Sequence, residues 1–200
     1  PYGLQSLYLN WGYNLEFHNI VWRLYYPTNL HLNNAKKLSA NNGKNVRVVG
    51  EPNYDRYLSS TLNPWKCEES KKKIIWAPHY QIEPNEMFYR PSFMWTYQLM
   101  VDIARLYKDR LHIAFKPHPK LFSTLCHHPE WGEERTKEYY KLWETMSNTQ
   151  LETGDFIDLF VNSDALIHDC GSFTSEYQYT KKPCMFLTRE DETLFDTLCP

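Results

Sequence analysis

Apolar residues gather in short runs over the last three-quarters of the chain, and polar residues, glycine or proline bound each run. Such runs are typical of strands that are covered on both faces, as in a parallel sheet. The pattern predicts five strands, at 45–49, 73–77, 111–115, 165–168 and 183–187.

Between the runs, apolar residues recur at three- and four-residue spacing, which indicates helices with one buried face. This spacing predicts four helices: one that begins at Ser92, and three over residues 130–146, 156–163 and 172–180. Ser92 and Asp155 are placed to cap two of them. The aromatic residues of "SFMWTYQL" share the helical spacing and are assigned to the core. Strands that alternate with helices imply right-handed crossovers and a doubly wound, Rossmann-like α/β sheet.

The first 45 residues differ in character, because they are rich in Asn, Tyr and Trp and lack this alternation. One helix is predicted there, from Leu30 to Asn42, with Gly43 as its end. We expect 1–45 to be the end of a preceding domain and 46–200 to form the α/β domain. We also expect the sequence to be a piece of a longer protein, cut at both ends.

Composition and charge narrow the class of partner. The 200 residues carry a formal net charge of −2 and are 42% hydrophobic, which describes an ordinary folded chain without a basic field for nucleic acid. Lys71, Lys72 and Lys73 form one basic cluster, interpreted as a solvated loop, with a membrane or phosphate role as the alternative. The cysteines show no CxxC pair, which predicts reduced thiols in a cytoplasmic protein and no zinc site. No apolar stretch has the length of a membrane span.

Ligands of doubly wound sheets bind beyond the carboxyl ends of the strands. That rule selects the polar residues that follow the strands at 73–77, 111–115 and 165–168. They are Pro78, His79, Tyr80, Lys116, His118, Asp169, Gly171, Ser172 and Ser175. We expect these residues to meet at one edge of the sheet.

The segment "FKPHP" follows the strand at 111–115 and contains two prolines. Pro117 and Pro119 keep the segment extended, because proline fixes its own backbone and restricts the residue before it. Lys116 and His118 are thereby presented on a stiff support, one as a fixed cation and the other as a titratable donor. This pair suits a diphosphate whose leaving oxygen gains charge, and it is the candidate catalytic pair. The alternative is a strand end with an incidental histidine.

The segment "DCGSFTSE" (169–176) places a turn of small residues between a buried strand and a helix. Backbone N–H groups and the Ser172 hydroxyl can face an anion there, where the helix dipole favours negative charge. Glu176, about one turn further on, could accept hydrogen bonds from a ribose diol. The alternative that Asp169 and Ser172 only cap the helix is equally compatible with these residues.

Other candidates carry less chemistry. His127 and His128 are adjacent and lack an acidic partner at helical spacing, so they are interpreted as loop residues rather than metal ligands. His168 lies inside a strand and is interpreted as a partly buried histidine whose hydrogen bonds are satisfied. No GxSxG motif is present to support acyl transfer. The sequence predicts no metal and no other cofactor.

Four ordered segments, "VVGEPNYD", "IIWAPHY", "FKPHP" and "DLFVNSDALIHDCGSFTSEYQYTKKPCMFL", resemble the donor-binding half of the CDP-glycerol glycerophosphotransferase family. The similarity covers about residues 46 to 190, and the last segment is its most specific part. The resemblance implies a GT-B architecture, in which two Rossmann-like domains face a cleft. It also implies that 46–200 is the nucleotide-donor-binding domain of that pair.

The resemblance assigns roles to matching positions. His118 matches the histidine of the family's His-Pro motif, which is expected to contact the donor pyrophosphate. Asp169 and Ser172 match the turn that binds the donor phosphates, and Glu176 stands where the family has an aspartate near the ribose. We add His79, Gly171 and Ser175 to the candidate donor-binding set because they follow strands that end at the same edge of the sheet.

Three departures from the family pattern are visible. Cys170-Gly171 replaces an aromatic-Ser pair, and His79 stands where Thr is common. The family's second histidine, in a His-Gly motif, has Tyr2-Gly3 as its nearest counterpart here. The general base is therefore not identified by the sequence.

The resemblance implies a transferase that moves glycerol phosphate, or a related polyol phosphate, from a CDP-linked donor to a hydroxyl of a cell-envelope saccharide or polymer, with CMP leaving. The implied partners are the nucleotide-linked donor and a saccharide or polyol phosphate polymer acceptor. A lipid-linked acceptor and peripheral membrane contact through regions outside this sequence are left open. The alternatives are a GT-B glycosyltransferase that uses a nucleotide sugar, a nucleotide-sugar epimerase, and a non-catalytic nucleotide-binding module in envelope polysaccharide assembly.

Overall fold

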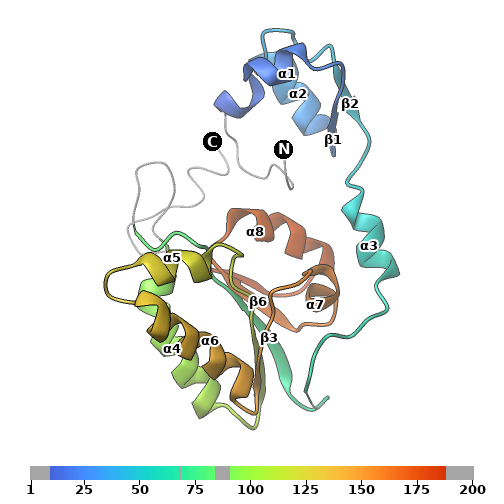
Figure 1. Ribbon diagram of the computed structural model, residues 1–200. Helices are drawn as coiled ribbons and strands as arrows, with labels where there is room; N and C mark the ends of the chain where they lie inside the picture. Colours follow the sequence, from blue (N-terminus) through green and yellow to red (C-terminus); the bar gives the residue numbers. More distant parts are fainter. Residues whose placement is uncertain (1–9, 68, 84–90, 188–200) are drawn as a thin grey trace. The chain divides into compact units, whose positions relative to one another are not determined.

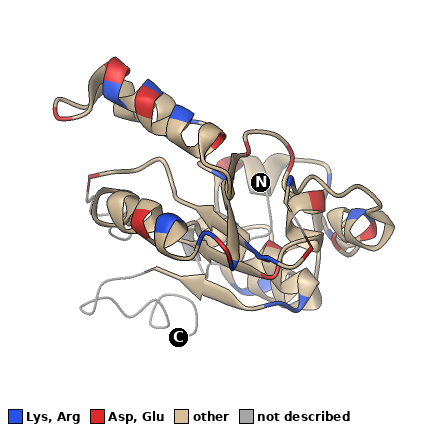
Figure 2. Ribbon diagram, turned by 90° about the horizontal axis from the view of Figure 1, so that it is seen from below, with Lys and Arg blue, Asp and Glu red and all other residues tan. Residues whose placement is uncertain are grey.

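The computed structural model describes residues 10–67, 69–83 and 91–187. Within these residues the chain forms two compact units that divide between Ser59 and Ser60 (Figure 1). Each unit has its own sheet and its own core, and the two are described separately. Acidic and basic residues are both spread over the ribbon (Figure 2), in keeping with a net charge of −2.

The first unit is built around two short parallel strands. Its elements are η1 (Asn10–Tyr13), α1 (Glu16–Ile20), β1 (Leu24–Tyr26), α2 (Asn29–Leu38), β2 (Val46–Val48) and α3 (Asn53–Ser59). The strand predicted at 45–49 is β2, and it pairs with β1, which the sequence pattern did not predict. Both strands pack on α2 through a small core that contains Tyr26, Ala35 and Val46. The domain limits of the complete protein stay a prediction.

The helix predicted from Leu30 to Asn42 is shorter in the structure, because α2 ends at Leu38. The turn that follows is built by side chains: Ser39 Oγ and Asn41 Oδ1 accept the N–H of Gly43, at 3.0 and 2.9 Å. Gly43 has a φ of +66°, in the left-handed region that glycine favours. A Cβ at this position would also come within 3.1 Å of the backbone nitrogen of Lys36. Gly43 is therefore required by the turn rather than by the helix end.

The second unit contains a five-stranded sheet with helices on both faces (Figure 1). Its elements are β3 (Lys72–Ala77), α4 (Phe93–Leu106), β4 (Leu111–Phe115), α5 (Leu121–His127), α6 (Gly132–Thr145), β5 (Thr149–Leu151), α7 (Ile157–Val161), β6 (Ala165–His168), α8 (Gly171–Tyr177), η2 (Gln178–Thr180) and β7 (Cys184–Phe186). The strands lie in the order β5-β4-β3-β6-β7, and every neighbouring pair is parallel. This arrangement confirms the predicted doubly wound, Rossmann-like class.

The core of the second unit is aromatic. Trp76 of β3 and Phe115 of β4 are fully buried, with ring centroids 4.9 Å apart, and Trp143 of α6 packs on both. Phe93, from the predicted helix with aromatic residues, stacks on Trp76 and confirms the core assignment, whereas Trp95 is 44% exposed. Buried aromatic side chains of this size each contribute several kcal/mol, so this cluster fixes how β3 and β4 lie under α4 and α6.

Asp155 makes hydrogen bonds at the start of α7, although the N-cap residue is Phe156 rather than the predicted Asp155. Asp155 Oδ1 accepts the N–H groups of Phe156 and Ile157 (2.6 and 3.2 Å) where α7 begins. The prediction for Ser92 is wrong, because its side chain makes no capping hydrogen bond to α4. The reason lies in its backbone, which has helical angles (φ −88°, ψ −19°) rather than the extended ones of a usual capping residue.

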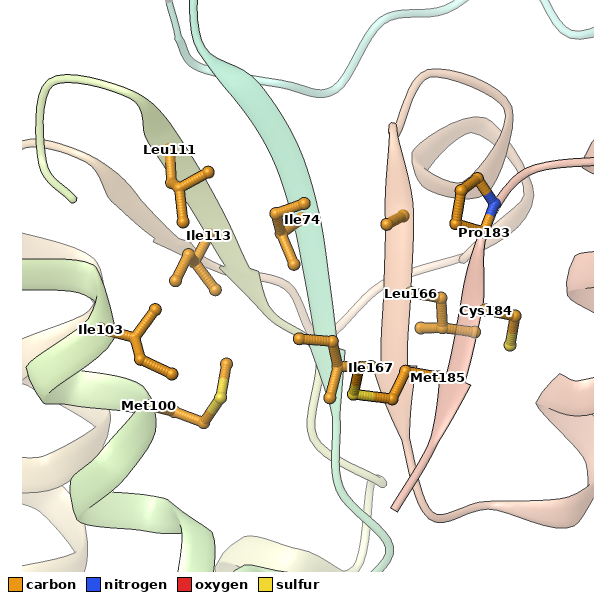
Figure 3. A pocket seen from close by; sticks show the side chains of 11 residues that line it. Ile74, Met100, Ile103, Leu111, Ile113, Leu166, Ile167, Pro183, Cys184 and Met185 are labelled. Carbon is orange, nitrogen blue, oxygen red and sulfur yellow. The ribbon is translucent and has the colours of Figure 1, made fainter.

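An apolar groove lies on the face of the sheet beside α4 (Figure 3). It has a volume of about 370 Å³ and is lined by Ile74, Met100, Ile113, Leu166 and Met185, among others. These side chains come from α4 and from four of the five strands, and none of them carries a charge. Across residues 10–67, 69–83 and 91–187, no helix combines the length and the apolar character that crossing a bilayer requires.

Candidate functional site

The predicted site residues follow three neighbouring strands that end at one edge of the sheet. In the register, Trp76 of β3 lies opposite Phe115 of β4, and Ala77 lies opposite His168 of β6. The strand order reverses at β3, which has β4 on one side and β6 on the other. Ligands of open α/β sheets bind at such a reversal, so the structure brings the predicted residues to the expected place.

Asp169 lies at the end of β6 and joins the loops that leave the sheet here. Its side chain is 0% exposed, and its two carboxylate oxygens accept the N–H groups of His79 (2.6 Å) and Ser92 (2.7 Å). Burial raises the pKa of Asp169, and the hydrogen bonds from Ser92 and His79 oppose that rise. Asp169 therefore ties the end of β3 and the start of α4 to β6. Its contact with donor phosphates stays a prediction.

His79 and His118 face each other across the ends of β3 and β4. Their ring centroids are 5.1 Å apart, and the ring of Tyr80 lies 4.6 Å from that of His118. The N–H of His118 donates to the carbonyl of Pro78 (3.0 Å), which continues the pairing of the two strands past their ends. The "FKPHP" segment is therefore held as a rigid extension of β4, as the sequence predicts.

The backbone fixes the tautomer of both histidines. Nδ1 of His118 accepts the N–H of Lys120 (3.1 Å), and Nδ1 of His79 accepts the N–H of Gln81 (3.3 Å). An accepting nitrogen does not hold the proton of a neutral imidazole, so Nε2 carries that proton in each ring. The pKa of both histidines is lowered to about 4; burial is the cause for His79, and for His118 burial is the largest cause, with smaller contributions from His79, Lys120 and Lys116. At neutral pH each ring is thus an uncharged Nε2–H donor.

Lys116 lies on the same strand as His118 but is buried. Only 6% of the residue is exposed, and Nζ donates to the carbonyl of Gly154 at 2.6 Å, in the loop after β5. Burial lowers the pKa of Lys116, while Glu152 and Asp155 raise it. In the structure this lysine therefore supports the loop between β5 and α7. Its predicted contact with a diphosphate stays a prediction.

Lys120 is a cation that the sequence reasoning missed. It precedes α5 and is exposed, and its Nζ lies 5.4 Å from the centre of the Tyr80 ring. Lys120 lies in the turn that leads from His118 into α5, where the Leu121 N–H donates to the His118 carbonyl (2.8 Å), and no periodic signal in the sequence identified it. Lys120 therefore supplies exposed positive charge beside the histidine pair, and both Lys120 and the buried Lys116 lower the pKa of His118.

The turn at the start of α8 carries the other predicted donor-binding residues. Gly171 is the first residue of α8, and Ser172 Oγ lies 3.2 Å from Cys170 Sγ. Cys170 is the N-cap and makes no side-chain capping hydrogen bond, so the alternative that Asp169 or Ser172 caps this helix is wrong. Ser175 is half-buried and Glu176 is 8% exposed. Their contacts with a donor stay predictions.

His168 and His127 have structural partners. His168 is 0% exposed, and its Nδ1 and Nε2 lie 2.9 Å from the Cys170 carbonyl and 3.2 Å from Cys184 Sγ, which confirms its interpretation as a satisfied histidine. His127 lies in α5 rather than in a loop, where its Nδ1 contacts the Ser123 carbonyl at 2.7 Å. No group of three or more potential metal ligands occurs within the described part of the chain. Tyr2 and Gly3 lie outside the described residues.

The fold and the edge at which the predicted residues collect define an α/β domain of the Rossmann type. Residues 20–195 match the family described as CDP-Glycerol:Poly(glycerophosphate) glycerophosphotransferase. Because this match spans most of the 200 residues, the chain belongs to that family. A search of curated proteins found no match.

Solved structures show the same fold at low sequence identity. The S. aureus MnaA-UDP co-structure has a TM-score of 0.54 and 17% identity, over 86% of this chain and 43% of that chain. UDP-GlcNAc 2-epimerase of Methanocaldococcus jannaschii, with UDP-GlcNAc and UDP, has a TM-score of 0.52 and 18% identity, over 90% and 49%. The wall teichoic acid polymerase TagF has a TM-score of 0.50 and 20% identity, over 82% and 38%. The chain thus spans less than half the length of these proteins.

Proposed function

We propose that the complete protein transfers glycerol phosphate, or a related polyol phosphate, from a CDP-linked donor to a hydroxyl of a cell-envelope saccharide or polymer, and releases CMP. The observation that carries this proposal is the family match over residues 20–195. The parallel sheet supports it, because the predicted site residues collect at the edge where such sheets bind nucleotides.

The reaction is a substitution at the phosphorus that carries the glycerol. An acceptor oxygen forms a bond to that phosphorus, the bond to the bridging oxygen breaks, and the acceptor gives up its hydroxyl proton. Negative charge then collects on the leaving phosphate of CMP. Positioning and electrostatic stabilisation dominate such chemistry, so the site needs donors and cations at the bridging oxygen.

His118 is the residue to which we assign the contact with the diphosphate. Its Nε2–H donates without carrying charge, because the Lys120 amide occupies Nδ1 and the pKa is about 4. A neutral donor with a low pKa does not serve as the base, since Nε2 already holds its proton. Lys120, exposed beside Tyr80, supplies the compensating positive charge.

His79 and Asp169 complete the proposed site in different ways. The His79 ring lies next to that of His118, with centroids 5.1 Å apart, so we place it beside the same anion. Asp169 acts through the backbone, because it fixes the His79 amide and the start of α4. It is therefore a positioning residue in this proposal. Lys116 positions the loop at Gly154.

The donor class can be tested on the complete protein. CDP-glycerol, CDP-ribitol and a set of UDP-sugars are each incubated with protein and acceptor, and released CMP or UDP is quantified. The proposal expects CMP from a CDP-linked polyol. Release of UDP without CMP would instead support a nucleotide-sugar enzyme, the class to which the similar UDP-GlcNAc 2-epimerase structures belong.

A further inference from the structure

Tyr80 connects the buried core of the second unit with the candidate site. The residue is half-buried, and its side chain packs against the buried cluster that contains Trp76 and Phe93. Its ring also lies against both histidines of the site, with centroids 4.3 Å from His79 and 4.6 Å from His118. Aromatic rings at such separations attract each other. The ring of Tyr80 is therefore held by the core and is in contact with the groups to which donor binding is assigned.

The backbone on both sides of Tyr80 is fixed by hydrogen bonds. The N–H of His79 donates to the buried carboxylate of Asp169 (2.6 Å), and the N–H of Gln81 donates to Nδ1 of His79 (3.3 Å). The loop thus presents the Tyr80 ring in one place before any ligand arrives. A site that is ordered in advance loses less entropy when a ligand binds.

Lys120 extends over the same ring. Its Nζ lies 5.4 Å from the ring centre of Tyr80, within the range of a cation–π interaction. No described carboxylate forms an ion pair with Lys120, and Glu83, in the loop that contains Tyr80, pairs with Nε2 of His128 (3.2 Å). The ammonium group is therefore held near His118 without being neutralised. An exposed lysine otherwise samples many rotamers, so a contact that restricts it lowers the entropy cost of binding an anion.

We propose that Tyr80 is a positioning residue of the donor site: its ring holds the Lys120 ammonium beside the His118 imidazole, so that both groups bind one diphosphate. This inference rests on the proposed function, because the diphosphate is that of the CDP-linked donor. Tyr80 acts through Lys120 and makes no contact with the reacting atoms. Burial is the largest cause of the lowered pKa of His118, and the charge of Lys120 is one of the smaller causes, as expected for two groups that lie close together.

The first test measures the CDP-glycerol affinity of the complete protein by calorimetry. Tyr80→Leu removes the ring but keeps an apolar side chain, and we expect the affinity to fall about fivefold. In a Lys120→Met background the same change should have an effect of less than about twofold, because the contact is already lost. No loss in Tyr80→Leu, or equal losses in the two backgrounds, would overturn the proposal.

Two further variants separate the ring from its size and place. Tyr80→Phe keeps the aromatic ring, so it should restore the affinity to within about twofold of that of the wild type. Tyr107→Leu removes a 41% exposed tyrosine that lies between α4 and β4, at the opposite edge of the sheet, and should leave the affinity unchanged. A Tyr80→Phe variant as weak as Tyr80→Leu would contradict a role of the ring.

The second test follows the ring signals of His118 in the ligand-free protein, labelled with ¹⁵N-histidine, as the pH falls from 7. Because Lys120 lowers the pKa of His118, Tyr80→Leu should raise that pKa in the wild-type background and leave it nearly unchanged in the Lys120→Met background. An equal rise in both backgrounds would mean that Tyr80 only covers the imidazole, and would refute the positioning role. Signals of the buried His168 verify that each variant is folded. A wild-type protein that does not bind CDP-glycerol would count against the proposed function, while the His118 signals still decide the role of Tyr80.

Discussion

Replacing Asp169 by Asn tests whether this residue positions the site or contacts the donor. The carboxylate accepts two backbone N–H groups, at 2.6 and 2.7 Å, from a fully buried position. A hydrogen bond to a charged acceptor contributes about 1.5–3 kcal/mol. Asn keeps one accepting oxygen and turns an NH₂ group toward the other amide, but it also avoids burying a charge. We therefore expect Asp169→Asn to lower the free energy of unfolding by about 2 kcal/mol, and Asp169→Ala by about 4 kcal/mol.

The assay is urea unfolding of the complete protein, with donor binding measured by calorimetry on the same samples. Asp158→Asn is the matched control, because that carboxylate accepts one hydroxyl hydrogen bond from Ser60 (2.7 Å) in a half-buried position. Asp158→Asn should lower the free energy of unfolding by less than about 1 kcal/mol. If Asp169 is a positioning residue, its replacement should lower the stability of the protein and its affinity for the donor together. Weaker donor binding in Asp169→Asn with wild-type stability would refute this reasoning and make Asp169 a direct ligand.

Four further outcomes follow from the contacts. His168 has a pKa of about 4 in the folded protein, against 6.5 in the unfolded chain, so the unfolded chain binds the proton first as the pH falls. Protonation of this histidine should therefore lower the free energy of unfolding by about 2 kcal/mol between pH 7 and pH 5. Urea unfolding at pH 7 and at pH 5 should show a smaller change in the free energy of unfolding for His168→Gln than for the wild type. Trp76→Ala should lower the unfolding free energy by about 3–5 kcal/mol in the same assay. Lys116→Met should cost about 2 kcal/mol of stability, through the lost bond to the Gly154 carbonyl. Lys120→Met should leave stability within about 0.5 kcal/mol of wild type while calorimetry shows weaker CDP-glycerol binding.

The sequence pattern predicted the central strands β3, β4 and β6 of the second unit, and also the largely exposed strands β2 and β7. β3, β4 and β6 lie within one residue of their predicted limits, because central parallel strands are continuous apolar runs. β5 was missed, since Thr149 and Gln150 are polar and buried only because Thr149 bonds to the Trp143 carbonyl and Gln150 to Pro64. Such tertiary partners leave no periodic signal in the sequence.

The candidate site was predicted as a set of residues but not as a geometry. The rule for parallel strands placed Lys116, His118 and Asp169 at one edge, and they lie there. The direction of each side chain depends on neighbours distant in sequence: Asp169 turns inward to amides 77 and 90 positions away, and Lys116 turns to Gly154. Sequence spacing does not encode those contacts.

The most specific segment of the family resemblance, residues 158–187, mainly makes contacts that hold the fold together. Ser163 Oγ contacts the Tyr177 hydroxyl at 2.7 Å, and Asp164 accepts the N–H of Lys73 at 2.8 Å. Lys182 Nζ donates to the carbonyls of Val161 and Ser163. These contacts fasten β6 to β3 and to α8, so the segment identifies the family through the frame that holds the site.

The most direct test of the account is CMP formation from CDP-glycerol by the complete protein and by two histidine variants. His118→Asn removes the Nε2–H donor from the site, and His127→Asn changes an exposed histidine of α5. We predict CMP release by the wild type, a loss of about a hundredfold or more in His118→Asn, and wild-type rates in His127→Asn. Undiminished CMP release by His118→Asn would contradict the assignment of the diphosphate contact to His118.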